Sequence, residues 1–219
     1  KVTVINRGID TSFYDPTINE EKKLIYFINK YQISSDNKII LYPGRLTDWK
    51  GQIEFLNVVE YFKNKQYTFY FAGDNKNLSY TRKLEKLIKE KNLSDKCKIL
   101  GHLNKEDLKM LYICSDLIIS MPTKPEGFGR IVSESLSMKK IILAYNFGGV
   151  KNQLDGLDNI YKLNTLDQKI IIDRIKFVFE SSTNQFDKIK QIGRDHIIKN
   201  FSKQQMLQKY LNFYKEILN

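Results

Sequence analysis

Short apolar runs alternate with longer amphipathic segments along the chain, and this alternation is the feature that most constrains its fold. The apolar runs predict β-strands at residues 38–44, 67–74, 97–102, 116–122, 140–145 and 159–163. Helices are expected at 51–64, 78–91 and 104–115, from about Phe128 onward, and at 166–180, 185–199 and 203–218. Since strands that alternate with helices form βαβ units, we predict an α/β fold with a Rossmann-like parallel sheet and helices on both faces.

The 219 residues suffice for one substantial core, and no linker rich in Pro, Gly or Ser divides them. We therefore expect a single domain over 1–219. Residues 1–12 resemble an incoming hinge, and 200–219 resemble a closing helix that belongs partly to a missing neighbour. The chain does not begin with Met and is interpreted as a fragment of a longer protein. No apolar run approaches the ~20 residues that a membrane-spanning helix needs.

The net charge of +11 is compatible with nucleic acid, an anionic membrane surface or a phosphorylated small ligand. Much of the excess lies on predicted helix surfaces, as in segment 76–98, where a solvated helix face is the simpler interpretation. An arginine-rich arm, zinc-finger spacing and an aromatic RNA-binding run are absent from the sequence, so we expect no nucleic-acid partner. Cys97 and Cys114 lie beside apolar runs and are expected as buried free thiols, which suits a reducing cytoplasmic setting.

Parallel sheets bind ligands beyond the carboxyl ends of their strands, so residues that follow the predicted strands are the first candidates for a site. Arg45 and Lys50 follow the strand at 38–44 and precede a helix. Two cations beside a helix N-terminus favour a diphosphate, because the helix end and both side chains attract anions. The alternative is that both are surface charges and that Trp49 is a packing anchor.

A second candidate segment, 124–138, follows the strand at 116–122. Gly127 and Gly129 let the backbone approach a ligand closely, while Glu126 precedes the expected helix start and Glu134 lies about two turns inside. Carboxylates accept hydrogen bonds from hydroxyls, so this pair suits a ligand with both sugar hydroxyls and phosphates. The alternatives are that Glu126 only complements the helix dipole and that Glu134 is an exposed helical residue.

Other segments after strands are weaker candidates. Gly148 and Gly149 again permit close backbone approach, although a plain turn explains them equally well. Segment 101–104 is a candidate lining of the cleft, with a packing role preferred for His102 and Asn104 expected to cap a helix. Neither a P-loop, nor a dinucleotide-binding glycine pattern, nor an Asp-x-Asp pair occurs. We therefore expect neither metal nor other cofactor, and side chains and helix ends must neutralise the ligand.

Together these segments resemble one family. The matching motifs are, in order, "VINRGID" (4–10), "GRLTDWKGQ" (44–52), "FAGD" (71–74), "GHL" (101–103), "KPEGFGRIVSES" (124–135) and "GGV" (148–150). They resemble the C-terminal, donor-binding domain of the retaining glycosyltransferases of family 4, which have the GT-B fold. The matches span nearly the whole chain, and the two glutamates eight residues apart within Pro-Glu-Gly-Phe-Gly are the most specific part.

The resemblance implies a role for each candidate residue. Arg45 and Lys50 would neutralise the donor diphosphate and the charge on the leaving group, Glu126 would hold the hydroxyls of the transferred sugar, and Glu134 would hold those of the ribose. The remaining donor contacts would come from Gly127, Phe128, Gly129, Gly148 and Gly149, with Gly101, His102 and Leu103 near the base. The reaction would be sugar transfer from a nucleoside diphosphate with retained anomeric configuration and without a bound metal.

The resemblance also implies an N-terminal acceptor domain that this chain does not contain, so the fragment is expected to bind donor weakly and transfer little. The leading hypothesis is the donor-binding half of a cytoplasmic enzyme that builds a surface glycan or glycolipid. Its positive surface would hold it near anionic lipid headgroups at the inner face of the membrane. The alternatives are a non-catalytic nucleotide-sugar-binding module and a basic module for nucleic acid or membrane.

Overall fold

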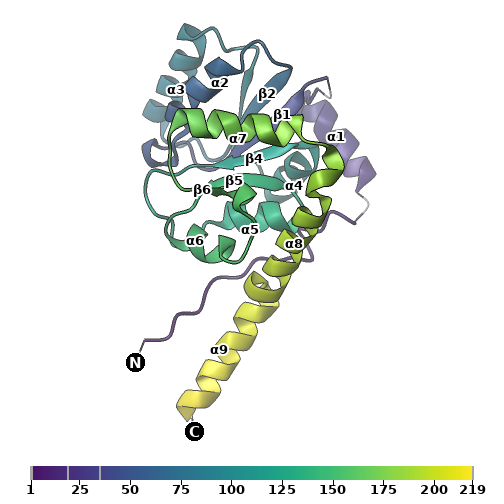
Figure 1. Ribbon diagram of the computed structural model, residues 1–219, viewed down its shortest axis with the longest axis vertical. Helices are drawn as coiled ribbons and strands as arrows, with labels where there is room; N and C mark the ends of the chain where they lie inside the picture. The colour runs from purple at the N-terminus through teal and green to yellow at the C-terminus, as the bar shows by residue number, and fades with distance from the viewer. Residues whose placement is uncertain (1, 19, 35, 219) are drawn as a thin grey trace.

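The computed structural model describes residues 2–18, 20–34 and 36–218, and within them the chain forms a six-stranded parallel sheet covered by helices (Figure 1). Lys1 and Asn219, the outer ends of the predicted hinge and closing helix, lie outside the described residues. The strands are β1 (Lys38–Pro43), β2 (Tyr67–Ala72), β3 (Cys97–Gly101), β4 (Leu117–Ser120), β5 (Ile141–Tyr145) and β6 (Lys162–Leu163). Their order in the sheet is β3-β2-β1-β4-β5-β6.

The helices pack in two groups: α2 contacts α3 and α7, whereas α1 contacts α4 and α5 contacts α8. Because crossovers between parallel strands are almost always right-handed, the strand order puts these groups on opposite faces of the sheet. This arrangement confirms the predicted Rossmann-like fold. The helices are α1 (Glu21–Tyr31), α2 (Gln52–Tyr61), α3 (Leu78–Glu90), α4 (Lys105–Cys114), α5 (Arg130–Ser137), α6 (Gly149–Leu154), α7 (Gln168–Glu180), α8 (Asp187–Phe201) and α9 (Lys203–Leu218), with short 3-10 helices at Asp48–Lys50, Asn159–Tyr161 and Thr183–Phe186.

The strand order creates a point at which the direction of winding reverses. The chain runs outward from β1 through β2 to β3 and then returns to the other side of β1 to form β4. Ile40 of β1 pairs with Phe69 of β2 on one side and with Leu117 of β4 on the other. The loops after β1 and β4 therefore leave the sheet in opposite directions, which opens a crevice at their carboxyl ends.

Helix α1 was not expected, since no element was assigned to residues 13–37. Its apolar side chains have helical spacing, and one of them, Phe27, is fully buried. The helix follows Glu20 without a side-chain cap and ends at Gln32 in the left-handed conformation (φ 51°). It therefore lacks the Ser, Thr, Asn or Asp start and the Gly stop that normally mark helix ends in a sequence.

A strand boundary and the burial of one thiol also differ from expectation. Only 162–163 of the predicted strand 159–163 pair with the sheet, because the Asp158 side chain accepts a hydrogen bond from the Ile160 N–H at 2.7 Å and starts a 3-10 turn. Of the two thiols, Cys97 is buried as expected, but Cys114 is only half-buried.

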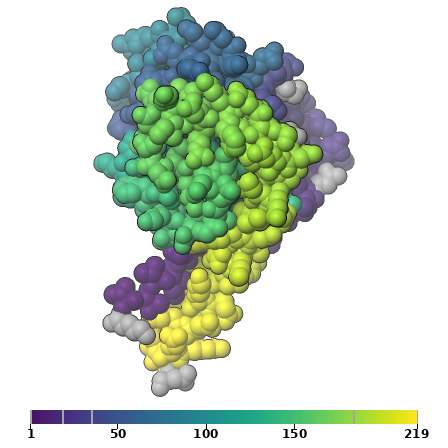
Figure 2. Space-filling view, viewed as in Figure 1, coloured from purple at the N-terminus to yellow at the C-terminus, as the bar shows by residue number. Residues whose placement is uncertain are grey.

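The ends of the described chain meet beside the body and then extend away from it (Figures 1 and 2). Ile9 forms a parallel bridge with Ser202, and its carbonyl accepts a hydrogen bond from the Lys203 N–H at 2.7 Å. Within its described residues, α9 has no buried side chain. The hinge and closing-helix assignments stay predictions. No helix in the described part of the chain is long and apolar enough to cross a membrane.

Candidate functional site

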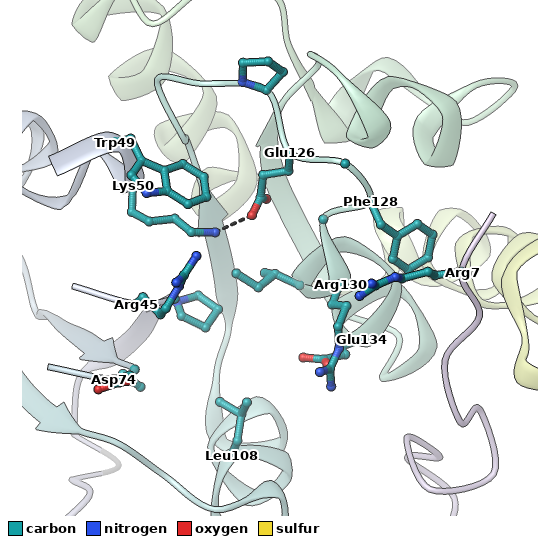
Figure 3. Close-up of a pocket in the computed structure, with 18 of the residues that line it drawn as sticks. Arg7, Arg45, Trp49, Lys50, Asp74, Leu108, Glu126, Phe128, Arg130 and Glu134 are labelled. Carbon is teal, nitrogen blue, oxygen red and sulfur yellow. Dashed lines mark hydrogen bonds and ion pairs between the residues drawn. The ribbon is translucent and has the colours of Figure 1, made fainter. Parts of the chain in front are cut away.

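The loops that follow β1, β2, β3 and β4 enclose a cleft of about 900 Å³ at the point where the winding reverses (Figure 3). Most of the residues singled out from the sequence line this cleft: Arg45, Lys50, His102, Leu103, Glu126, Gly127, Phe128, Gly129 and Glu134. Gly101, Gly148 and Gly149 are not among the described residues that line it. The structure therefore brings together three segments that lie far apart in the sequence.

An ion pair between Lys50 and Glu126 joins the loop after β1 to the loop after β4 in the wall of the cleft (Figure 3). Lys50 Nζ donates to Glu126 Oε1, although the two residues are 76 positions apart. Lys50 is only 7% exposed, so it is not the surface charge of the alternative interpretation. The second carboxylate oxygen, Glu126 Oε2, is buried and has no hydrogen-bond partner among the described residues. The Glu126 carboxylate therefore has acceptor capacity that the described residues do not use.

A buried tyrosine of β1 holds the backbone of Lys50 in place. The Tyr42 hydroxyl donates to the Lys50 carbonyl at 2.5 Å and accepts from the Met121 N–H at 3.3 Å. Burial raises the pKa of Tyr42, which keeps this hydroxyl protonated. The next residue, Gly51, has φ +81°, and a Cβ there would come within 2.5 Å of the Met121 carbonyl oxygen. Glycine at this position therefore lets the loop after β1 close against the end of β4.

Arg45 is exposed at the rim of the cleft, and its guanidinium lies 5.7 Å from the centroid of the Trp49 ring. Lys50 Nζ lies 4.6 Å from the same centroid, so both cations lie close to the Trp49 ring. Arg45 forms no ion pair within the described part of the chain, which leaves its guanidinium free for an anionic ligand. Trp49 is half-buried and lines the cleft beside the two cations, and the packing-anchor role stays a hypothesis.

Glu134 is buried, which corrects the alternative of an exposed helical residue: it is 3% exposed. It also lies about one turn inside α5 instead of two, because the helix begins at Arg130 and not at Phe128. Glu134 Oε1 accepts from Arg130 Nη2 at 2.8 Å, and Oε2 accepts from the Tyr112 hydroxyl at 3.1 Å. Burial raises the pKa of Glu134, while the Arg130 charge opposes that shift. The two oxygens retain acceptor capacity for a ligand.

The turn before α5 is built around two glycines with different functions. Gly129 has φ +79°, and a Cβ there would lie 2.6 Å from Val150 Cγ2, so only glycine fits this contact. At Gly127 a Cβ would meet nothing within 4 Å, so this glycine leaves open space over the cleft. Between them, the Phe128 ring is buried and lies 6.0 Å from the Phe201 ring at the end of α8. The turn is thus anchored on one side and open on the other.

Gly148 and Gly149 pack directly against the 125–129 turn. The Gly149 N–H donates to the Glu126 carbonyl at 2.7 Å. A Cβ on Gly149 would lie 2.2 Å from the Gly127 carbonyl oxygen, and one on Gly148 would lie 2.8 Å from Pro125 Cβ. The close backbone approach predicted for this pair is therefore made to the 125–129 turn.

The loop after β3 forms another edge of the cleft. His102 is exposed and Leu103 is buried, and both line the cleft, whereas Gly101 ends β3 with φ +66° beside the Asn75 side chain. The Asn104 side chain accepts a hydrogen bond from the Asp107 N–H at 2.8 Å and caps α4, as predicted. A base-binding role for this loop stays a prediction.

Several residues of the site were missed from the sequence. Arg7 lines the cleft and lies near Phe128 and Arg130 in Figure 3. The Tyr112 hydroxyl holds Glu134, but the helical spacing of Tyr112 indicated only a core position. Cations and carboxylates thus alternate around one concave surface, a combination that suits a ligand with both phosphates and hydroxyls.

Comparison with known proteins assigns the chain to a family. The model of the family described as "Glycosyl transferases group 1" matches residues 23–196. The chain therefore belongs to the group 1 glycosyl transferases. It is 29% identical over 163 residues to an uncharacterised glycosyltransferase of Methanocaldococcus jannaschii, which covers 72% of this chain and 40% of the relative. An alpha-D-kanosaminyltransferase of Streptomyces kanamyceticus is 25% identical over 122 residues, 55% of this chain and 31% of the relative.

Solved structures show the same fold. A glycosyltransferase from Rickettsia africae superposes with a TM-score of 0.93 at 33% identity, covering all of this chain and 58% of that one. The Anabaena protein HepE, solved in complex with UDP and glucose, superposes with a TM-score of 0.85 at 21% identity, covering 98% of this chain and 57% of that one. The chain thus spans about half the length of the relatives it matches.

Proposed function

We propose that this chain is the C-terminal, donor-binding domain of a retaining glycosyltransferase of family 4, which moves a sugar from a nucleoside diphosphate to a glycan or lipid acceptor. The observation that carries the proposal is the Lys50–Glu126 pair, with its unpartnered oxygen, facing a cleft beside the start of α5. Membership of the family and the UDP and UDP-glucose complexes of Anabaena HepE support it.

In this proposal Arg45 and Lys50 bind the diphosphate and stabilise the negative charge that develops on it as the sugar departs. The first N–H groups of α5 contribute at the same place, because a helix N-terminus attracts anions. Glu126 Oε2 accepts a hydroxyl of the transferred sugar, and Glu134 accepts the ribose hydroxyls. The loop from Gly101 to Leu103 contacts the base. No step requires a bound metal or another cofactor.

The acceptor site would lie on an N-terminal domain, in the part of the relatives that this chain does not span. The chain alone would then bind donor but transfer little. We place the full enzyme in the cytoplasm, with its basic surface near anionic lipid headgroups at the inner face of the membrane. The exposed apolar residues of α9 and the extended segment before Ile9 would belong to the junction between the two domains.

Calorimetric titration of the chain with UDP, GDP and ADP tests the proposal. We expect one nucleotide to bind and Lys50→Ala to weaken it roughly ten-fold, since a charge-assisted hydrogen bond contributes about 1.5–3 kcal/mol. Lys86→Ala is the matched control, because Lys86 is exposed on α3 and, among the described residues, pairs only with Glu90. An equal loss in both variants, or no binding of any nucleotide at millimolar concentration, would contradict the proposed donor site.

A further inference from the structure

Two fully buried glutamines, Gln52 and Gln153, lie directly behind the two main walls of the cleft. Glutamine is mostly exposed in proteins, and burial of its amide costs free energy unless both ends are hydrogen-bonded. A Leu or Met side chain would fill a similar volume without that cost. The hydrogen-bond partners of the two amides therefore indicate why glutamine is present.

Gln153 of α6 is bonded to the turn that begins α5. Its Nε2 donates to the carbonyls of Phe128 and Gly129, the latter at 3.2 Å, and its Oε1 accepts from the Ser133 hydroxyl. A peptide unit is planar, so fixing these two carbonyls also fixes the N–H groups of Gly129 and Arg130. The Arg130 N–H is the first of α5 and the Gly129 N–H directly precedes it, at the helix end that the proposed function directs at the donor phosphates.

Gln52 of α2 likewise bonds to the backbone of the other main wall, the loop after β1. Its Nε2 donates to the Arg45 carbonyl at 3.0 Å, and its Oε1 accepts from the Tyr80 hydroxyl at 3.1 Å. That hydroxyl also accepts from the Ile53 N–H at 3.2 Å, so its own position is fixed. Arg45 thus has an exposed side chain on a backbone that is held by a hydrogen bond from a buried residue.

We propose that Gln153 and Gln52 are positioning residues, one for each wall, that hold the peptide planes of the cleft in the orientation that receives the donor diphosphate. The proposal rests on the proposed function and deepens it. Neither glutamine is among the described residues that line the cleft, so both act through backbone that does. The two amides belong to different helices and have no hydrogen-bond partner in common.

The test compares Gln153→Met and Gln52→Met with the unaltered chain, because methionine keeps the volume and removes the amide. Hydrogen exchange is measured over 124–131 and 44–50, and UDP, GDP and ADP are titrated. We expect faster exchange at 124–131 in the first variant and at 44–50 in the second, with nucleotide affinity reduced about three- to ten-fold in each.

Tyr161→Phe separates positioning from a general loss of stability. It removes a hydrogen bond of 3.0 Å from the Tyr161 hydroxyl to the Ile189 carbonyl, and neither residue lines the cleft. We expect it to lower the unfolding midpoint while nucleotide affinity and exchange at the two loops stay unchanged. An equal loss of affinity in this control would overturn the proposal.

Wild-type affinity or unchanged local exchange in both methionine variants would likewise overturn it. If Gln153→Met does not fold, Ser133→Ala replaces it, since this change keeps the amide but frees its oxygen. If the unaltered chain binds none of the three nucleotides, the proposed function fails, and the exchange data still decide whether the glutamines hold the loops. A rise confined to 124–131 and 44–50 supports that role, and its absence refutes it.

Discussion

Replacement of Lys50 by methionine should destabilise the chain as well as weaken ligand binding. Glu126 Oε2 already has no partner in the described structure, and the change would also remove the partner of Oε1. The carboxylate would then be left in the cleft wall without a donor. Glu126→Met should cost a similar amount, because among the described residues it leaves the Lys50 ammonium with only the Trp49 ring beside it.

The exposure of the two side chains sets the size of the effect. The Lys50 and Glu126 side chains are 9% and 12% exposed, so the pair is intermediate between two known classes. Fully exposed pairs contribute about 0.2–1 kcal/mol, whereas disruption of a fully buried pair costs about 3–5 kcal/mol. We expect about 2 kcal/mol for each single variant, or about 5 °C in the unfolding midpoint of a chain of this length. The double variant should be about as stable as either single one, with a coupling energy of about 2 kcal/mol.

The assay is a double-mutant cycle by urea unfolding, followed by circular dichroism and by the fluorescence of Trp49, the single tryptophan of the chain. The control cycle uses Lys86 and Glu90 on α3, a pair 74% and 53% exposed, for which a coupling below about 0.5 kcal/mol is expected. If the Lys50–Glu126 coupling is no larger than that of the control, the two groups do not interact in solution. The cleft would then not be preorganised, and the reasoning behind the donor site would fail.

Three further predictions concern other charged side chains. Glu134→Gln should weaken nucleotide binding about ten-fold in the same titration, and an unchanged affinity would exclude its ribose role. Burial lowers the pKa of Lys140 to about 8, so between pH 8 and pH 10 the unfolded chain binds the proton that the folded chain has released. Folding stability relative to Lys140→Met should therefore rise by about 2 kcal/mol across that range, and parallel urea curves would contradict this. Arg194 donates to the Tyr14 carbonyl at 2.9 Å and pairs with Asp15 at 2.7 Å. Replacement of Arg194 by methionine should lower the free energy of unfolding by about 3 kcal/mol. An unfolding midpoint within experimental error of the wild type would refute the role of Arg194 in joining α8 to residues 14–15.

Local patterns in the sequence were sufficient to predict the fold class and most of the cleft. Each strand is an apolar run of its own, and each amphipathic segment repeats at helical spacing, so both are visible without knowledge of their neighbours. In a parallel sheet the loops after the strands gather at one edge, which is why Arg45, Lys50 and Glu126 could be chosen as candidates. The helix at Glu21–Tyr31 escaped this reasoning because its ends carry none of the usual start and stop residues.

The remaining features depend on which strands become neighbours, and a periodic pattern does not encode that order. Lys50 reaches Glu126 because β4 lies beside β1, and Gly149 reaches Glu126 because β5 lies beside β4. The burial of Glu134 and the hydrogen bonds of Gln52 and Gln153 arise in the same way, from helices that pack only once the sheet is complete. The sequence alone thus determined which residue types follow each strand, whereas tertiary structure decided which of them are paired, buried or left open to a ligand. Pairing and burial require contacts between distant segments, and such contacts form only in the folded chain.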